Sequence, residues 1–374
     1  MSTERLLATF IDLLRIDSPS GFEAELAGHC AAELERMGFA VRFDESTALT
    51  GSDTGNLIAE LPGTAPGAPV LLLCAHFDCV EPCRGVEPVV TDGVVSSAGD
   101  TVLGADDKAG IAAIFEGVRR TIEAGSMRGD IRVVLTVAEE CGLKGAKALD
   151  PADAAAGLCL VLDADGEPGG MVIGAPTHYT FVAHFAGAAS HAGVAPERGR
   201  SALVMASRAV AAMELGRLDE VTTANVGTIE GGTATNVVPA RVTLTGECRS
   251  LDARRIDEVR EAMDAVMKEA AASLDGEVEV VWTKEYEAFR TPEDSPAIAT
   301  MREACADAGV TPRLLTTGGG SDGSVFAERG TPTVVLSCGM RSVHSADETM
   351  SVADLEALTR LVSASIVRFA GARR

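Results

Sequence analysis

The sequence predicts an α/β protein with a mainly parallel, mixed sheet between helices, interrupted by a smaller α+β domain of ferredoxin type. Three observations predict this class. Short apolar runs alternate with helical patterns through the first 175 residues, alternating strand patterns begin near Thr177, and the first pattern resumes after residue 288. We therefore expect a discontinuous larger domain over 1–176 and 288–374 and an inserted domain over 177–287.

Short apolar runs mark the buried strands of the larger domain. A helix is predicted at Asp107–Ala124, because apolar residues recur there in steps of three and four. A long turn-rich segment that includes Asp92-Gly93 precedes this helix, and we predict it to be a loop. The expected strands are Val70–Cys74, Ile131–Val137 and Leu158–Leu162.

Alternating patterns mark the strands of the inserted domain. Helical stretches at about 200–215 and 253–273 lie between them, which gives a β-α-β-β-α-β order. The expected strands are Tyr179–Phe185, Asn225–Ile229, Arg241–Arg249 and Val278–Trp282. After residue 288 we expect a helix at Ser295–Ala308, strands at Arg313–Thr316 and Thr333–Ser337, and a helix from Val352.

The chain of 374 residues carries a formal net charge of −23. A chain this acidic is repelled by nucleic acid and by anionic lipid, so we expect neither as a partner. No apolar run approaches the roughly 18 residues that a membrane helix needs, and the N-terminal stretch lacks the apolar core of a signal peptide. The nine cysteines do not suggest a disulfide framework, so we expect a cytoplasmic protein.

Histidines and acidic residues follow the predicted strands of the larger domain. His76 comes after the first strand, Glu139-Glu140 after the second and Asp163 at the end of the third, while His344 follows the last strand. Asp106 closes a glycine-rich loop just before a helix. Because the carboxyl ends of parallel strands meet at one sheet edge, these residues can converge there. Two histidines with three or more carboxylates suit a pair of divalent metal ions.

Each of these residues also has an ordinary structural interpretation. A single histidine after a strand is more often a capping or core residue than a ligand. Asp106-Asp107 fits the start of the following helix, and Glu139-Glu140 and Asp163 fit ordinary turns. The ordered combination, rather than any one member, favours a metal site. Two further roles are then open, namely Asp78 as the acceptor that orients His76 and Glu139 as a general base.

Five segments in this order resemble the peptidase T branch of the aminoacylase and carboxypeptidase superfamily of co-catalytic zinc hydrolases. The resemblance covers nearly the whole chain, which is similar to the peptidase T-like group. Phe77 and Cys79 stand where the family commonly has Met and Thr. The segments are Ala75-His76-Phe77-Asp78, Gly104-Ala105-Asp106-Asp107-Lys108-Ala109-Gly110, Ala138-Glu139-Glu140-Cys141-Gly142, Leu162-Asp163-Ala164 and His344-Ser345-Ala346-Asp347-Glu348.

The resemblance implies a zinc-peptidase-like catalytic domain that binds two divalent metal ions. We expect zinc, with cobalt or manganese as the alternatives. The implied ligands are His76, Asp106 and Asp163 for one ion and Asp106, Glu140 and His344 for the other.

The same resemblance gives roles to the neighbouring residues. Glu139 is implied as the general base for the attacking water, and Asp78 as the residue that orients His76. The bond between Asp106 and Asp107 is implied to be cis. The inserted domain looks like the family's lid, which often also dimerises, so a homodimer through this domain is expected.

Further segments resemble those with which the family binds its substrate. His191 matches a histidine that helps to stabilise the oxyanion, often donated by the partner subunit. Asn236 and Arg249 match residues that touch the substrate backbone or carboxylate, for which a guanidinium is well suited. Gly319 and Ser321 belong to a glycine-rich loop that resembles the one lining the family's pocket. Without the resemblance, His191 and Arg249 would be read as surface residues.

These features predict two-metal hydrolysis of amide bonds in short peptides, and an aminopeptidase of the tripeptidase kind is the leading interpretation. An N-acyl amino acid deacylase, a dipeptidase or a carboxypeptidase of the same architecture is the alternative. A metal-stabilised peptide-binding protein without turnover is a third interpretation. Such a protein has no need of Glu139 or Asp78, and this argues against it.

Overall fold

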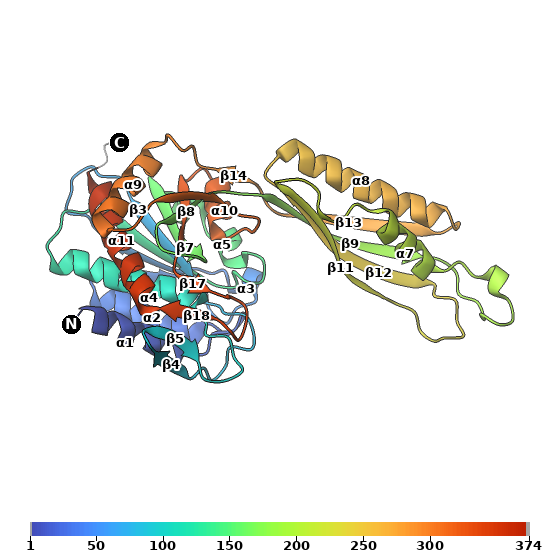
Figure 1. Cartoon of the computed structure of the whole chain (residues 1–374), viewed down its shortest axis with the longest axis horizontal. Helices are drawn as coiled ribbons and strands as arrows, with labels where there is room; N and C mark the ends of the chain where they lie inside the picture. Colours follow the sequence, from blue (N-terminus) through green and yellow to red (C-terminus); the bar gives the residue numbers. More distant parts are fainter. Residues whose placement is uncertain (1, 372–374) are drawn as a thin grey trace. The chain divides into compact units, whose positions relative to one another are not determined.

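The computed structural model describes residues 2–371, and the chain divides into two compact units (Figure 1). The first unit comprises the residues up to Ile173, Arg290–Thr316 and the residues from Ser321 onward. The second unit comprises Gly174–Phe289 and Thr317–Gly320. The glycine-rich segment 317–320 therefore belongs to the second unit, although the chain on both sides of it belongs to the first.

The first unit is built on a nine-stranded mixed sheet. Its central strands β6, β3, β7 and β16 run parallel, whereas the pairs β1–β2, β2–β6 and β16–β8 are antiparallel. The central strands are apolar and buried, as expected for strands covered on both faces. This confirms the predicted α/β class with a mainly parallel mixed sheet. The strands in order are β1 (Ala40–Phe43), β2 (Leu57–Leu61), β6 (Ile131–Thr136), β3 (Leu71–His76), β7 (Leu158–Ala164), β16 (Thr333–Ser337), β8 (Gly170–Ala175) and β14 (Phe289–Arg290), with β15 (Arg313–Thr316) beside β8.

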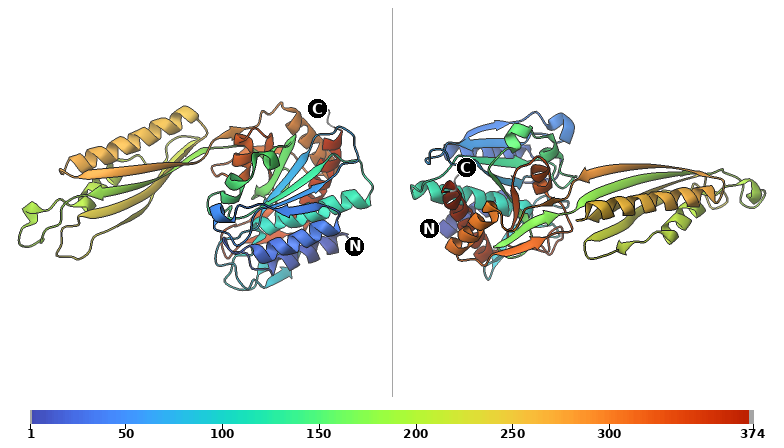
Figure 2. Two further views of the ribbon diagram at one scale, coloured as in Figure 1. Left: turned by 180° about the vertical axis from the view of Figure 1, so that it is seen from behind. Right: turned by 90° about the horizontal axis from the view of Figure 1, so that it is seen from above.

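Helices pack beside this sheet and complete the larger core (Figure 2). α4 contacts β3, β7, α1 and α11, and α11 also contacts α9. α4 and α11 approach closely at Gly117, where a Cβ atom would lie 2.7 Å from Cγ1 of Val362. The helices of this unit are α1 (Ser2–Leu14), α2 (Ala24–Arg36), α3 (Thr47–Thr50), α4 (Ala105–Glu123), α5 (Lys144–Ala148), α6 (Pro151–Ala154), α9 (Pro296–Ala308), α10 (Asp322–Glu328) and α11 (Val352–Ala370).

The segment predicted as a turn-rich loop contains a β-hairpin, so that prediction is wrong. β4 (Pro88–Thr91) and β5 (Val94–Ser97) pair across Asp92-Gly93, whose φ angles are 51° and 78°. An Asp-Gly pair between two short strands is a hairpin signal, because both residues adopt positive φ at little cost. β5 continues through β18 (Thr349–Ser351) to β17 (Met340–Arg341) in a separate four-stranded sheet.

The second unit is a five-stranded antiparallel sheet with its own hydrophobic core. α7 (Ala202–Ala212) and α8 (Ala253–Ala272) contact each other and the sheet (Figure 1). The predicted strands and helices are present in the expected order, with a short additional strand β10 and a 3₁₀ turn, η1 (Pro196–Arg198). The strands in order are β10 (Gly216–Arg217), β11 (Thr222–Gly231), β12 (Arg241–Ser250), β9 (Thr177–Ala186) and β13 (Glu277–Tyr286).

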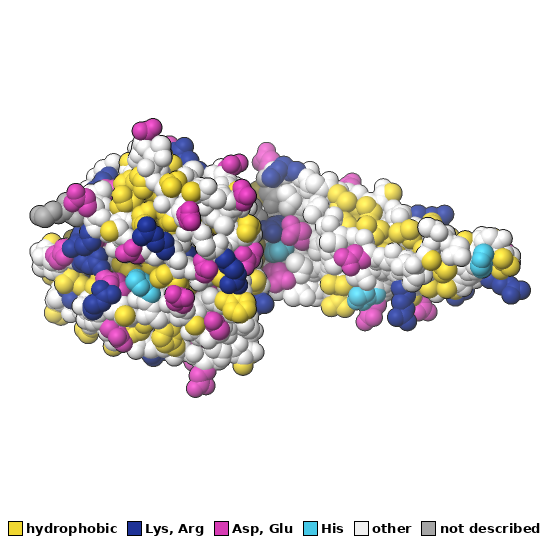
Figure 3. All heavy atoms as spheres, turned by 90° about the horizontal axis from the view of Figure 1, so that it is seen from below, with side chains coloured by type: hydrophobic (Ala, Val, Ile, Leu, Met, Phe, Trp, Pro, Cys, Tyr) yellow, Lys and Arg dark blue, Asp and Glu magenta, His cyan; other side chains and the backbone are white. Residues whose placement is uncertain are grey.

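Charged side chains of both signs lie on the drawn surface, and most of the cysteines are buried. Between residues 2 and 371, none of the helices has both the length and the apolar character needed to span a membrane. On the face drawn in Figure 3, Lys and Arg side chains lie among Asp and Glu side chains on each unit. All nine cysteines are free thiols, and eight of them are buried.

Candidate active site

Three of the five predicted metal ligands lie at or just after the ends of parallel strands in the first unit. His76 is the last residue of β3, and Asp163 lies near the end of β7, which pairs with β3 in parallel. Glu139 and Glu140 follow β6, the parallel neighbour of β3 on its other side. Since parallel strands end at the same edge, these polar side chains share one edge of the sheet.

Asp106, at the start of α4, joins two clusters that are each centred on a histidine. Its Oδ1 lies 3.1 Å from Nε2 of His76, and its Oδ2 lies 3.2 Å from Nε2 of His344. Nε2 of His344 also lies 2.8 Å from Oε1 of Glu140, and Nε2 of His76 lies 3.6 Å from Oδ1 of Asp163. The two oxygens of one carboxylate thus face different histidines, which is what a ligand shared by two metal ions requires.

Two groups of side chains have ligand atoms that all lie within 4.8 Å of one another. One group is His76, Asp106 and Glu140, and the other is His76, Glu139 and Asp163. Glu139, which the sequence predicts as a base rather than a ligand, therefore reaches the same space as two predicted ligands. This position suits a carboxylate that contacts the attacking water.

The electrostatics of this edge show an excess of negative charge. Burial raises the pKa of Asp163 to about 7, although His76 favours its charged form. Burial and the charge of Asp163 raise the pKa of Glu139 well above its usual range. Hydrogen bonds to Asp106 and Glu140 raise the pKa of His344 to about 10. A divalent cation would supply the missing positive charge at these nitrogen and oxygen donors, so the residues fit a metal ion.

The contacts at the start of α4 distinguish the helix-capping interpretation of Asp106-Asp107 from the metal-ligand interpretation. The bond between these residues is cis, as the family resemblance implies. Oδ1 of Asp107 accepts a hydrogen bond from the backbone N–H of Gly110 at 3.1 Å, and its Oδ2 accepts from the N–H of His76 at 3.3 Å. Asp107 therefore caps the helix and ties it to β3, whereas the carboxylate of Asp106 faces the histidines.

The carboxylate of Asp78 supports the loop after β6 more directly than it supports His76. It accepts hydrogen bonds from the backbone N–H groups of Glu139 at 2.9 Å and Glu140 at 3.2 Å, and from the hydroxyl of Ser20 at 2.7 Å. Nδ1 of His76 lies 2.9 Å from the carbonyl oxygen of Asp78 and 3.6 Å from its carboxylate. The sequence predicts the carboxylate as the acceptor, but this carboxylate is turned toward the two N–H groups of the neighbouring loop.

Glu348 is a functional candidate that the sequence reasoning did not single out. Its side chain is buried, and it accepts hydrogen bonds from the backbone N–H groups of Gly104 at 2.7 Å and Asp106 at 3.0 Å. Glu348 therefore fixes the backbone on which Asp106 is carried. The one available signal was its place at the end of the segment that begins at His344.

Two residues of the site adopt the left-handed backbone region that favours glycine. Ala138, directly before Glu139, has φ 50°, and His344 itself has φ 61°. A non-glycine residue in this region is under local strain, which the surrounding contacts must offset. Near Ala138 these contacts include a hydrogen bond from its N–H to the buried carboxylate of Glu23 at 3.1 Å.

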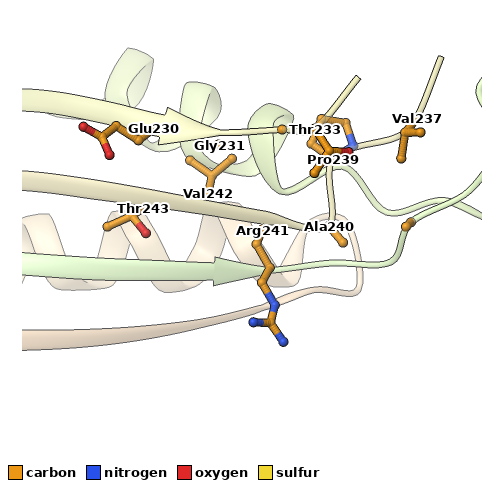
Figure 4. Close-up of a pocket in the computed structure, with 11 residues that line it drawn as sticks. Glu230, Gly231, Thr233, Val237, Pro239, Ala240, Arg241, Val242 and Thr243 are labelled. Atoms are coloured by element: carbon orange, nitrogen blue, oxygen red, sulfur yellow. The ribbon is translucent and has the colours of Figure 1, made fainter. Parts of the chain in front are cut away.

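Two of the predicted substrate-binding residues lie on adjacent segments of the second unit. His191 forms an isolated bridge with Val237, and the N–H of Ala192 donates to the carbonyl of Asn236 at 2.9 Å. Val237 also lines a hollow of about 520 Å³ beside the ends of β11 and β12 (Figure 4). The polar side chains that line it are those of Glu230, Thr233, Arg241 and Thr243.

The other three predicted substrate-binding residues are divided between the units. Arg249 on β12 and Gly319 in segment 317–320 belong to the second unit. Ser321 belongs to the first, where its hydroxyl caps α10 by accepting from the N–H of Gly323 at 3.2 Å. The five predicted metal ligands all belong to the first unit.

Comparison with known proteins agrees with the fold. Residues 72–368 match the sequence profile of Peptidase family M20/M25/M40. The chain is 40% identical over 366 residues to the uncharacterized protein YqjE of Bacillus subtilis, with 98% of each chain covered. It superposes on aminopeptidase PepT from Bacillus cereus with a TM-score of 0.91 at 39% identity, covering 98% of this chain and 99% of that one. A tripeptidase from Staphylococcus aureus gives a TM-score of 0.94 at 36% identity, with 98% of each chain covered.

The fold and the family define a hydrolase of the metal-dependent α/β class, with histidine and carboxylate side chains together at one edge of its mixed sheet. The chain belongs to Peptidase family M20/M25/M40 and is a metallopeptidase. The predicted resemblance and the predicted enzyme class are thereby confirmed.

Proposed function

We propose that the protein is an aminopeptidase that cleaves short peptides, tripeptides in particular, with two divalent metal ions. The observation that carries this proposal is the carboxylate of Asp106, whose two oxygens face His76 and His344 at 3.1 and 3.2 Å. The match along 98% of the chain to an aminopeptidase and a tripeptidase supports the choice of substrate. The proposed ligands are His76, Asp106, Glu140, Asp163 and His344.

Different residues of this chain would bind the metal ions, transfer the proton and position the reacting groups. His76, Asp106, Glu140, Asp163 and His344 would hold two divalent ions, which would supply polarisation of the scissile carbonyl and a lowered pKa for the attacking water. Glu139 takes the proton of the attacking water and delivers it to the leaving amine. The carboxylate of Asp78 accepts hydrogen bonds from the backbone N–H groups of Glu139 and Glu140. It therefore fixes the positions of the proposed base and of a proposed metal ligand relative to each other.

Zinc is the proposed native metal, because imidazole and carboxylate ligands suit it, and cobalt or manganese is the alternative. The proposed catalytic domain is 1–176 with 288–374, and 177–287 is the proposed lid, through which two copies would form a dimer. We propose that His191, Asn236, Gly319 and Ser321 bind substrate, with His191 serving the oxyanion. The free thiols of all nine cysteines suit a cytoplasmic setting.

A panel of matched substrates tests the proposal. The zinc-loaded protein is incubated with Ala-Gly-Leu, its N-acetyl derivative and N-acetylalanine, and the products are identified by mass. We expect release of alanine from the free tripeptide, no cleavage of the acetylated tripeptide, and loss of activity with a chelator. Release of leucine would assign a carboxypeptidase instead, and cleavage of N-acetylalanine alone would assign a deacylase.

A further inference from the structure

The four consecutive backbone N–H groups of segment 137–140 donate to buried side-chain oxygens from three other parts of the first unit. This segment follows β6 and contains the proposed base and a proposed metal ligand. An N–H group inside a protein needs an acceptor, and here side chains take the place of a neighbouring strand or a helix turn. The pairs are Val137 with Asn56 at 3.1 Å, Ala138 with Glu23 at 3.1 Å, and Glu139 and Glu140 with Asp78 at 2.9 and 3.2 Å.

Glu23 binds the one residue of this segment that has a positive φ angle. Ala138 has φ 50°, in the left-handed region, where an alanine is strained and depends on its surroundings. Asn56 and Asp78 bind the residues on either side of it. The contact with Glu23 therefore fixes the backbone of the residue directly before Glu139.

The carboxylate of Glu23 is itself held by neighbouring residues. It accepts hydrogen bonds from the hydroxyl of Ser52 at 2.6 Å and from the backbone N–H of Gly21. The backbone N–H of Glu23 donates to Oδ1 of Asp53 at 2.8 Å. Because the side chain is fully buried and each of its oxygens has a partner, Glu23 presents Oε1 to Ala138 in a fixed position.

Asn56 closes the loop after β6 at both of its ends. Its Nδ2 donates to the carbonyl oxygen of Gly145 at 2.9 Å and to Oδ2 of Asp44 at 2.7 Å. Since its Oδ1 accepts from Val137, one buried amide spans the loop from 137 to 145. A Cβ atom at position 145 would lie 2.5 Å from this Oδ1, so the close approach requires glycine there. The loop is thus anchored at its ends, and Glu23 controls the turn inside it.

We propose that Glu23 is a positioning residue for Glu139, and that it acts through the reach of its oxygen to the N–H of Ala138 rather than through its charge. The inference rests on the proposed function, since it takes Glu139 as the base. A base must lie within hydrogen-bond reach of the proton that it accepts, and a displacement of about 1 Å can cost about 100-fold in rate. Without the bond to Glu23, Ala138 can relax out of the left-handed region and carry Glu139 away from the position that a base needs.

Two substitutions that separate reach from charge test this role in the metal-loaded full-length protein, with Ala-Gly-Leu as the substrate. Glu23→Asp keeps the charge but is one methylene too short to reach Ala138, so kcat should fall about 10- to 100-fold while KM stays within about 3-fold. Glu23→Gln loses the charge but keeps an oxygen of the same reach, so kcat should stay within about 5-fold of wild type. Metal content per chain should be unchanged in both variants. Glu25→Asp, on the exposed first turn of α2, is the matched control and should change neither kcat nor KM.

A double-mutant cycle shows whether Glu23 acts through Glu139. In the Glu139→Gln background, Glu23→Asp should lower kcat by less than about 3-fold, because the base that Glu23 positions is already absent. Thermal unfolding followed by circular dichroism shows whether each variant is folded. If Glu23→Asp does not fold, Ser52→Ala, which frees the other oxygen of Glu23, takes its place in the cycle.

Three outcomes would overturn the inference. Equal losses from Glu23→Asp in both backgrounds, or a loss for Glu23→Gln as large as that for Glu23→Asp, would refute the role of Glu23 and leave the proposed function intact. Full turnover by Glu139→Gln alone would refute the proposed base, and the inference with it. If the enzyme cleaves only N-acetylalanine, the proposed substrate is wrong, and the same cycle measured on N-acetylalanine still decides the role of Glu23.

Discussion

The carboxylates at the sheet edge of the first unit and the carboxylate of Glu247 in the second unit are both partly or wholly buried, yet their surroundings differ. In the first unit, burial raises the pKa of Asp163 to about 7 and that of Glu139 well above its usual range. In the second unit, His178 and Arg249 lower the pKa of Glu247 to about 2. The negative charge of the first region is not compensated by the protein, whereas the charge of Glu247 is compensated by its neighbours.

This difference separates carboxylates whose charge the protein leaves uncompensated from one whose charge the protein compensates. Buried carboxylates that repel one another are costly, and a bound cation removes that cost. A carboxylate paired with a guanidinium and an imidazole has its charge compensated within the protein. The predictions below test the two halves of the comparison.

Loss of the shared carboxylate should have the largest effect. Asp106→Asn removes the charge that both histidine clusters contact, and should lower kcat at least about 1,000-fold, because metal catalysis supplies several kcal/mol. Metal content per chain, measured by elemental analysis, should fall in parallel. Full activity with a full metal content in this variant would contradict the bridging role.

Loss of the base should come next and should leave the metals in place. Glu139→Gln keeps the shape of the side chain and its backbone hydrogen bond to Asp78, but cannot accept a proton. We expect kcat to fall about 100- to 10,000-fold while metal content stays the same. Rapid turnover by the metal-loaded variant would assign the base to another residue.

Loss of Glu348 should weaken the site without removing a ligand. Glu348→Gln leaves one of the two N–H groups, of Gly104 or Asp106, without a carboxylate oxygen. We expect about a 10- to 100-fold loss of metal affinity, as is usual for groups that orient a ligand. Competition with a chelator measures this loss. Asp347→Asn, an exposed neighbouring change, should leave the affinity unaltered.

The smallest expected effect concerns stability in the second unit. The pKa of Glu247 is lowered from 4.5 to about 2, so its contribution to stability is present above about pH 4.5 and disappears as the pH falls toward 2. Because its side chain is 32% exposed, Glu247→Gln should cost no more than about 1 kcal/mol at neutral pH. Urea unfolding followed by Trp282 fluorescence should show the difference from wild type shrinking as the pH falls from about 6 to about 3. A constant difference across this range would show that the charge of Glu247 contributes nothing.

Local patterns in the sequence were sufficient for most of the fold. The apolar runs at 71–76, 131–136 and 158–164 form the parallel strands, because a strand covered on both faces must be apolar throughout. The hairpin at Asp92-Gly93 was missed although its turn residues are typical of one, because its exposed valines do not form a buried apolar run. His76, Glu140 and Asp163 lie together because each is at or just after the end of a parallel strand, and such ends share one edge of the sheet.

The sequence by itself determined the class of the protein, the strand ends that carry histidine and carboxylate, and the family. Only the tertiary structure decided how these groups are oriented. It turned the two oxygens of Asp106 toward different histidines, placed Glu348 on the N–H of Asp106 from 242 positions away, and joined Arg249 to Glu247 and Gly318. The physical reason is that spacing along the chain fixes which side chains lie on one face or edge, whereas hydrogen-bond partners depend on distances between distant segments. The sequence does not show whether an arginine is paired with a carboxylate of the protein, as Arg249 is with Glu247.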